Sequence, residues 1–96
     1  MTETMTLKVL TREGLSREEA AVSVIAPGTL GYLGMLRRHA PLVTTLAPGK
    51  LIWQRPDGER LAMRIGAGLL EVVKNRITVL TDSVSEPKAA PAQRGF

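Results

Sequence analysis

The stretch 50-KLIWQRPDGERLAMRI-65 decides the fold class of this 96-residue chain. Residues 50–55 and 60–65 are short, largely apolar runs, and Pro56-Asp57-Gly58-Glu59 separates them. Proline presets the backbone angle of a turn and glycine accepts a positive φ, so the four central residues predict a tight reversal of the chain. The stretch therefore predicts a β-hairpin.

Further strand-like runs lie on both sides of this hairpin, with glycine and proline between them. They cover residues 5–9, 20–26, 42–46, 69–73 and 76–80. Short apolar runs between closely spaced turn signals are typical of a sandwich or barrel, so we predict an all-β fold of seven to ten strands. Residues 16–19 match a helix capping box, but β-branched residues follow from Val22, and a strand or loop is the favoured interpretation.

The chain divides by composition into one domain and a tail. Residues 1–84 carry the strand pattern, and a chain of this length can bury one modest core. Residues 85–96 are rich in proline and alanine and have no apolar repeat. We predict a β-sandwich domain over 1–84 and a flexible Pro-rich tail over 85–96.

The residues that carry chemistry are scarce. The chain has no cysteine, and His39 is the only histidine, so we expect no metal site and no catalytic residue. The glycines of 28-GTLGYLG-34 lack the Gly-Lys-Ser/Thr ending of a phosphate-binding loop. We therefore expect no nucleotide site, no cofactor and no small-molecule ligand.

The charge pattern argues against nucleic acid and the membrane interior as direct partners. The net charge is +4, but the basic residues are scattered, and aromatic residues that could stack on bases are few. No apolar run approaches the roughly 20 residues that a membrane-spanning helix needs. We expect a soluble, cytoplasmic protein without direct membrane insertion.

One apolar run has two open interpretations. Leu30, Tyr32 and Leu33 lie in a glycine-spaced, loop-like stretch. They can fill the core, or they can form a protruding contact surface, since tyrosine combines a large contact area with a polar group. The residues alone indicate no more than a non-catalytic, all-β interaction module.

Two sequence blocks are more specific. The first comprises Ala26-Pro27-Gly28, Gly31, Leu33-Gly34, His39-Ala40-Pro41-Leu42, Thr44 or Thr45, Leu46 and Pro48-Gly49. The second comprises Gly66, Gly68-Leu69-Leu70-Glu71-Val72, Asn75, Ile77-Thr78-Val79-Leu80 and Asp82. In order and separation both blocks resemble the epsilon subunit of F-type ATP synthases, over residues 5–82.

The resemblance implies a fold and a role. In that family the N-terminal domain is a flattened β-sandwich of ten short strands, which agrees with the strand count. It binds the gamma subunit and sits on the c-ring, so that the central stalk turns with the membrane rotor. The resemblance thus implies a non-catalytic subunit of a rotary, ion-transporting ATP synthase. It also implies a peripheral position on the cytoplasmic face of the bacterial inner membrane.

The resemblance also implies two sets of site residues. The loop that faces the c-ring matches Thr29, Leu30, Gly31 and Tyr32. The side that faces the gamma subunit matches His39, Thr44, Glu71, Thr78 and Asp82.

Three features depart from the family pattern. Leu30 and Tyr32 stand where relatives commonly have polar or acidic residues. Arg37-Arg38 replaces the Pro-Gly that precedes the histidine, and we hypothesise that these arginines meet acidic groups on a partner. The chain also lacks the C-terminal α-helical hairpin usual in the family, so we expect no inhibition of ATP hydrolysis through such a hairpin.

Other classes of protein are weighed against this resemblance. A stand-alone β-sandwich adaptor that binds a protein, peptide or carbohydrate is the main alternative, although three aromatic residues would line a groove poorly. A nucleic-acid-binding β-barrel would need stacking aromatics along a basic groove. An enzyme would need an acid–base or nucleophile pair, and the sequence offers none.

Overall fold

The computed structural model describes residues 3–90, and residues 1–2 and 91–96 lie outside the described part. The described chain is all-β, as predicted, and contains no helix between residues 3 and 90. Its ten strands are β1 (Met5–Thr11), β2 (Gly14–Ala21), β3 (Ser23–Gly28), β4 (Gly31–Leu36), β5 (Leu42–Leu46), β6 (Gly49–Gln54), β7 (Arg60–Ile65), β8 (Gly68–Val73), β9 (Arg76–Thr81) and β10 (Lys88–Ala89).

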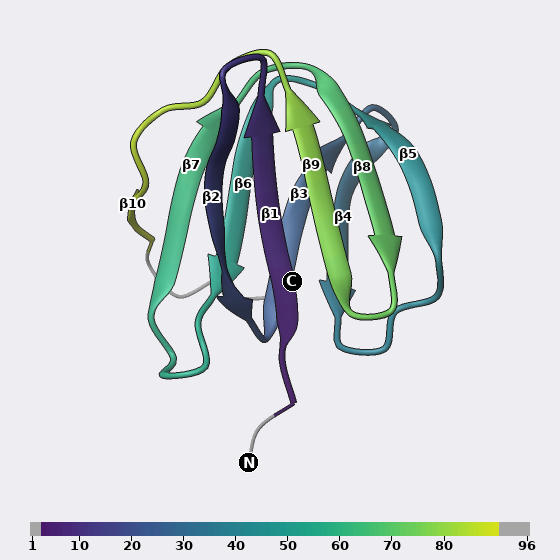
Figure 1. Ribbon diagram of the computed structural model, residues 1–96, viewed down its shortest axis with the longest axis vertical. Helices are drawn as coiled ribbons and strands as arrows, with labels where there is room; N and C mark the ends of the chain where they lie inside the picture. Colours follow the sequence, from purple (N-terminus) through teal and green to yellow (C-terminus); the bar gives the residue numbers. More distant parts are fainter. Residues whose placement is uncertain (1–2, 91–96) are drawn as a thin grey trace.

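The ten strands form one continuous sheet that curls into two layers (Figure 1). The first layer has the order β5-β8-β9-β1-β2, and the second has the order β10-β7-β6-β3-β4. A single pairing of Gly28 in β3 with Leu46 in β5 connects the layers. The neighbouring strands pair antiparallel except for β1 and β9, which are parallel. The predicted β-sandwich of about ten short strands is confirmed.

The core lies between the two layers and follows the alternation of the strands. In β1 the side chains of Met5, Leu7 and Val9 are fully buried, whereas the residues between them face outward. Trp53 in β6 has the largest fully buried side chain. Burial of a side chain of this kind contributes roughly 1.5–3 kcal/mol, so this apolar cluster is the main stabilising feature of the sandwich.

The two predicted hairpins form as expected. Between β6 and β7, the Arg55 amide donates to the Glu59 carbonyl over 2.8 Å, and Gly58 has a φ of 94°. Between β8 and β9, Lys74 and Asn75 have φ angles of 48° and 60°. Two consecutive left-handed residues are the signature of a type I′ turn, whose twist matches that of the adjoining strands.

The prediction of a single strand over 20–26 is wrong, because this stretch spans the boundary between β2 and β3. β2 ends at Ala21 and β3 begins at Ser23, and the Val22 amide donates to the Gln54 carbonyl over 2.9 Å. β2 pairs with β1 in the first layer, whereas β3 pairs with β4 and β6 in the second. Residues 16–19 lie within β2, so the strand interpretation of this segment is confirmed.

Part of the segment expected to form a tail runs beside β7. Lys88 and Ala89 pair with Ala62 and Leu61 as strand β10. The Ser85 hydroxyl accepts a hydrogen bond from the Arg64 amide over 2.9 Å. The paired part of the sheet therefore reaches residue 89, beyond the expected domain boundary at 84. Residues 91–96 of the expected tail lie outside the described residues.

Candidate interaction surfaces

The turn between β3 and β4 presents an apolar tip, which we call the tip loop and which consists of Thr29, Leu30, Gly31 and Tyr32. The Leu30 side chain is fully exposed and that of Tyr32 is 58% exposed. Leu33, the third member of the apolar run, is partly buried against the core. Leu33 therefore fills the core, and Leu30 and Tyr32 form a protruding surface.

Hydrogen bonds fix the tip loop to two neighbouring strands. The Thr29 amide donates to the Thr45 carbonyl over 3.2 Å, and the two threonine hydroxyl oxygens are 2.8 Å apart. The Tyr32 hydroxyl accepts from the Lys50 amide over 3.3 Å. Gly31 has a φ of 130°, a left-handed value that favours glycine. The apolar tip is thus held to both β5 and β6.

The outward side of the first layer is the second candidate surface, which we call the outer face. Leu70 and Val72 of β8 point into the core, so Glu71 between them points outward. Cross-strand pairing places Thr78 beside Glu71 on one side and Val43 on the other. Glu71 and Thr78, both expected to face the gamma subunit, therefore lie side by side on the outer face.

An apolar row crosses the outer face next to Glu71 and Thr78. Leu69, Leu80 and Leu15 are 46%, 47% and 54% exposed, and Leu10 joins Leu80 to Leu15 through strand pairing. Exposed apolar side chains in one contiguous row mark a site of protein contact. Sequence reasoning missed this row, because the run Leu69–Leu70 is apolar on both faces of its strand and does not show which leucine is exposed.

The other residues expected on the gamma-facing side lie elsewhere. Thr44 pairs with the buried Leu70 and so takes the inward side of β5. His39 lies in the turn after β4, where its Nδ1 is 2.6 Å from the Ala40 carbonyl oxygen. Asp82 follows the end of β9, close to Gly66. The five expected residues therefore do not form one patch.

The β4–β5 turn contains Arg37-Arg38, where the resemblance led us to expect Pro-Gly. Arg38 adopts a φ of 65°, and its amide donates to Asn75 Oδ1 over 2.6 Å. The Arg38 guanidinium forms an ion pair of 3.0 Å with Glu3, and Arg37 donates to the Glu3 carbonyl over 3.2 Å. The acidic group that we expected on a partner is thus supplied for Arg38 by the chain itself.

An ionic cluster around Glu19 joins the two layers. The Glu19 carboxylate accepts hydrogen bonds of 2.6 Å from both Arg17 and Arg55, and Arg55 also pairs with Glu59 over 2.7 Å. The Arg17 guanidinium lies 5.9 Å from the centre of the Trp53 ring, within the range of a cation–π contact. Since Glu19 belongs to β2 and Arg55 follows β6, the cluster closes the sandwich along one edge.

The cluster changes the acidity of its members. Burial by itself raises the pKa of Glu19, but hydrogen bonds from Arg55 and Arg17, with a further effect of the nearby Trp53 indole, lower that pKa to about 2. The Trp53 Nε1 makes no hydrogen bond of good geometry to any described residue. The carboxylate partners raise the pKa of Arg55. Glu19 and Arg55 are therefore both charged at neutral pH.

The described residues 3–90 contain no cluster of histidine, cysteine or acidic side chains able to hold a metal ion. They also contain no helix able to span a membrane. The two-layered sheet, the tip loop and the outer face define the class as a β-sandwich module with surfaces suited to protein contact.

The particular family follows from comparison with known proteins. Residues 4–87 match the family model described as "ATP synthase, Delta/Epsilon chain, beta-sandwich domain". The match covers most of the chain, which therefore belongs to this family. The expected resemblance is confirmed.

Bacterial relatives agree with this assignment. The chain is 44% identical over 75 residues to an ATP synthase epsilon chain of Stenotrophomonas maltophilia, covering 78% of this chain and 53% of the relative. It is 46% identical over 63 residues to that of Xylella fastidiosa, covering 66% of this chain and 45% of the relative. The chain thus spans about half the length of the curated relatives it matches.

Solved structures share the fold at low sequence identity. A chain of the Euglena gracilis mitochondrial ATP synthase, solved as OSCP, F1 and c-ring, superposes with a TM-score of 0.82 at 20% identity. That superposition covers 91% of this chain and 55% of the other. A chain of the Tetrahymena thermophila ATP synthase central stalk and c-ring gives 0.69 at 13% identity, covering 88% and 68%. These matches establish the β-sandwich fold.

Proposed function

We propose that this chain is a central-stalk module of a rotary ATP synthase that connects the gamma subunit to the c-ring. Through this connection, rotation of the ring driven by ion flow reaches the sites of ATP synthesis. The module performs no bond chemistry. Its position is peripheral, on the cytoplasmic face of the bacterial inner membrane, and it reaches the membrane through its partners.

The observation that carries this proposal is the double role of β5. Thr45 of β5 is hydrogen-bonded to the tip loop, and Val43 of the same strand lies beside Glu71 on the outer face. Only one residue, Thr44, thus separates the attachment points of the two surfaces. A load applied to the tip loop passes through backbone hydrogen bonds into the sheet that bears the outer face.

The outer face suits the gamma subunit, because it combines an apolar row with hydrogen-bonding groups. Specific protein interfaces bury about 800 Å² per partner and place apolar side chains at the centre of a polar rim. Leu69 and Leu80 provide the centre, and Glu71 and Thr78 provide part of the rim. The tip loop is the proposed contact with the c-ring, and the exposed Leu30 and Tyr32 make that contact apolar.

Co-purification with a gamma subunit from the same source tests the proposal. Leu80→Asp and Glu71→Arg change the outer face, whereas Leu36→Asp makes the same leucine change on the second layer, where Leu36 is 65% exposed. We expect the first two variants to lose gamma binding and the third to keep it. If the wild-type chain binds gamma and all three variants still bind it, the assignment of the outer face to gamma is wrong.

A stand-alone adaptor remains the second candidate function. The apolar row on the outer face would serve an adaptor equally well, because exposed apolar rows mark protein contacts in general. Failure of the wild-type chain to bind gamma at both low and moderate salt would favour this candidate.

A further inference from the structure

The outward side of the second layer differs in charge from the outer face. Leu51 and Trp53 of β6, and Leu61, Met63 and Ile65 of β7, point into the core. The outward residues of these strands therefore include four cations, which are Lys50, Arg60, Arg64 and Lys88 of β6, β7 and β10. None of the four forms an ion pair with a described residue.

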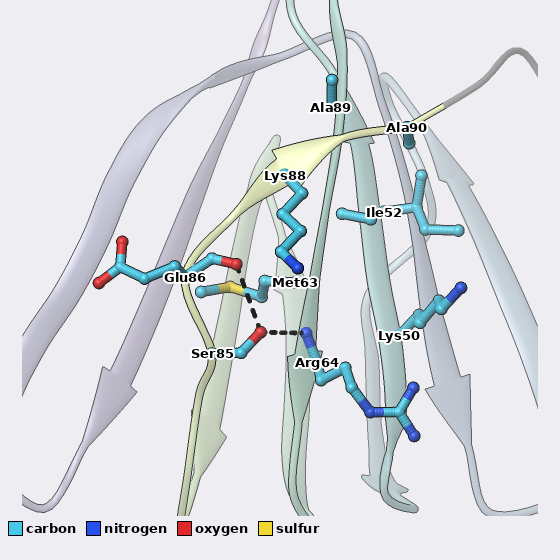
Figure 2. Close-up of a pocket in the computed structure, with 10 residues that line it drawn as sticks. Lys50, Ile52, Met63, Arg64, Ser85, Glu86, Lys88, Ala89 and Ala90 are labelled. Atoms are coloured by element: carbon cyan, nitrogen blue, oxygen red, sulfur yellow. Dashed lines mark hydrogen bonds between the residues drawn. The ribbon is translucent and has the colours of Figure 1, made fainter.

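Three of these cations surround an open cleft of about 490 Å³, shown in Figure 2 and called here the basic cleft. Lys50 and Arg64 are direct cross-strand neighbours, and Lys88 is the neighbour of Ala62 on the other side of β7. Ile52 and Ala62 give the cleft an apolar floor. The acidic residue at its rim, Glu86, directs its carboxylate away from Lys50 and Arg64 (Figure 2).

The basic cleft adjoins the tip loop. The Lys50 amide donates to the Tyr32 hydroxyl over 3.3 Å, so one residue of the basic cleft is hydrogen-bonded to the tip loop. In membrane proteins tyrosine is enriched at the boundary between membrane and water, and lysine and arginine are enriched in the loops on the cytoplasmic side. The cleft therefore lies next to the surface that, in the proposed function, approaches the membrane-embedded ring.

We propose that the basic cleft binds an anionic phospholipid headgroup at the edge of the rotor ring. The phosphate is held by Lys50, Arg64 and Lys88, with the Ser85 hydroxyl within reach, and the glycerol end of the acyl chains lies over Ile52 and Ala62. Flexible cations around an apolar floor suit this amphiphile better than free phosphate, which has no apolar part. The location in the complex rests on the proposed function, whereas the chemistry of the cleft does not.

The test uses the full chain alone and vesicles of two compositions. These are phosphatidylcholine, and phosphatidylcholine with about a third phosphatidylglycerol, a fraction that gives the strongly negative surface to which basic residues bind. The test variant is Lys50→Glu with Arg64→Glu. The matched control is Lys8→Glu with Arg76→Glu, which makes the same charge change on the outer face.

We expect the wild type to sediment with the anionic vesicles only, and less so at high salt. A basic side chain near an anionic surface increases partitioning roughly fivefold. The cleft variant should therefore bind at least about 20-fold more weakly, since two attractions are lost, while the control stays within about fivefold. Millimolar inorganic phosphate should compete weakly.

Three results would overturn the proposal. Absence of wild-type binding to anionic vesicles at low salt would leave an acidic protein as the partner of the cleft. Equal losses in the cleft and control variants would mean attraction by net charge alone. Full displacement from vesicles by millimolar phosphate would mean a site for the free anion. Since neither gamma nor the ring is present, these results are independent of the co-purification test.

Discussion

Replacement of Glu19 by glutamine tests the ionic cluster that closes the sandwich. The change keeps the size of the side chain but removes the charge that accepts hydrogen bonds from Arg17 and Arg55 at 2.6 Å. It leaves the Arg17 guanidinium beside Trp53 without its carboxylate, and it leaves Arg55 with Glu59 alone. We expect loss of stability at neutral pH without loss of the fold.

The magnitude follows from the pKa of Glu19, which falls from an ordinary value of 4.5 to about 2. At about 1.4 kcal/mol per pKa unit, this change corresponds to an upper bound of roughly 3–4 kcal/mol. The two arginine side chains are 29% and 34% exposed, so solvent screening reduces the contribution. We therefore expect Glu19→Gln to lower the free energy of unfolding by about 1–2 kcal/mol at pH 7.

The direction of the pKa shift determines how this stabilisation depends on pH. Because folding lowers the pKa of Glu19, the stabilisation is fully present above pH 4.5 and is lost as the pH falls towards 2. The difference in the free energy of unfolding between the wild type and Glu19→Gln should therefore fall to less than half its value at pH 7 by about pH 3. The relevant titration window lies between pH 4.5 and about 2.

Urea unfolding followed by Trp53 fluorescence measures this difference, because Trp53 is the single tryptophan and is fully buried. With a slope near 1 kcal/mol/M, the midpoint should fall by about 1–2 M at pH 7. Glu18→Gln, on the exposed side of the same strand, is the control and should change stability by less than about 0.5 kcal/mol. A loss in Glu19→Gln that is equal at pH 7 and pH 3 would refute the reasoning.

Three further predictions concern the stability of the fold. Gly68→Ala places a Cβ against the Leu80 carbonyl, and thermal unfolding should show a loss of about 1–3 kcal/mol or more. Leu70→Ala should lower the free energy of unfolding in urea by about 2–5 kcal/mol, because Leu70 is fully buried. Leu69→Ala on the same strand should lower it by less than about 1 kcal/mol, and equal losses would contradict the assigned faces. Arg38→Gly should be tolerated better than Arg38→Val in thermal unfolding, because φ at this position is 65°; the opposite order would contradict the turn geometry.

Local signals in the sequence were sufficient for the fold class and the hairpins. Pro56 and Gly58 mark the β6–β7 turn, and alternation from Met5 to Val9 marks β1. The break at Val22 was not predictable, because the run 20–26 carries no glycine or proline and the break arises from pairing with different strands in two layers. The parallel pairing of β1 with β9 depends on contacts far apart in sequence and has no local signal.

The candidate site was predictable only in part. The tip loop was indicated by its glycine spacing and apolar residues, and Leu30 and Tyr32 are exposed there. Whether Thr44 points inward or outward depends on its pairing with Leu70 of the neighbouring strand. The sequence of β5 alone does not reveal this pairing. The sequence does not show whether Leu69 and Leu80 are exposed or buried in the core, because a strand with leucine on both faces can turn either face inward.

The most direct test of the central claim is reconstitution of the chain with both the gamma subunit and the c-ring from the same source. We predict a ternary complex from which Leu80→Asp removes gamma but not the ring, and Leu30→Asp removes the ring but not gamma. This separation follows from two surfaces on one stiff sandwich joined through β5. Failure of the wild-type chain to bind either partner, or loss of both partners in each variant, would contradict the account.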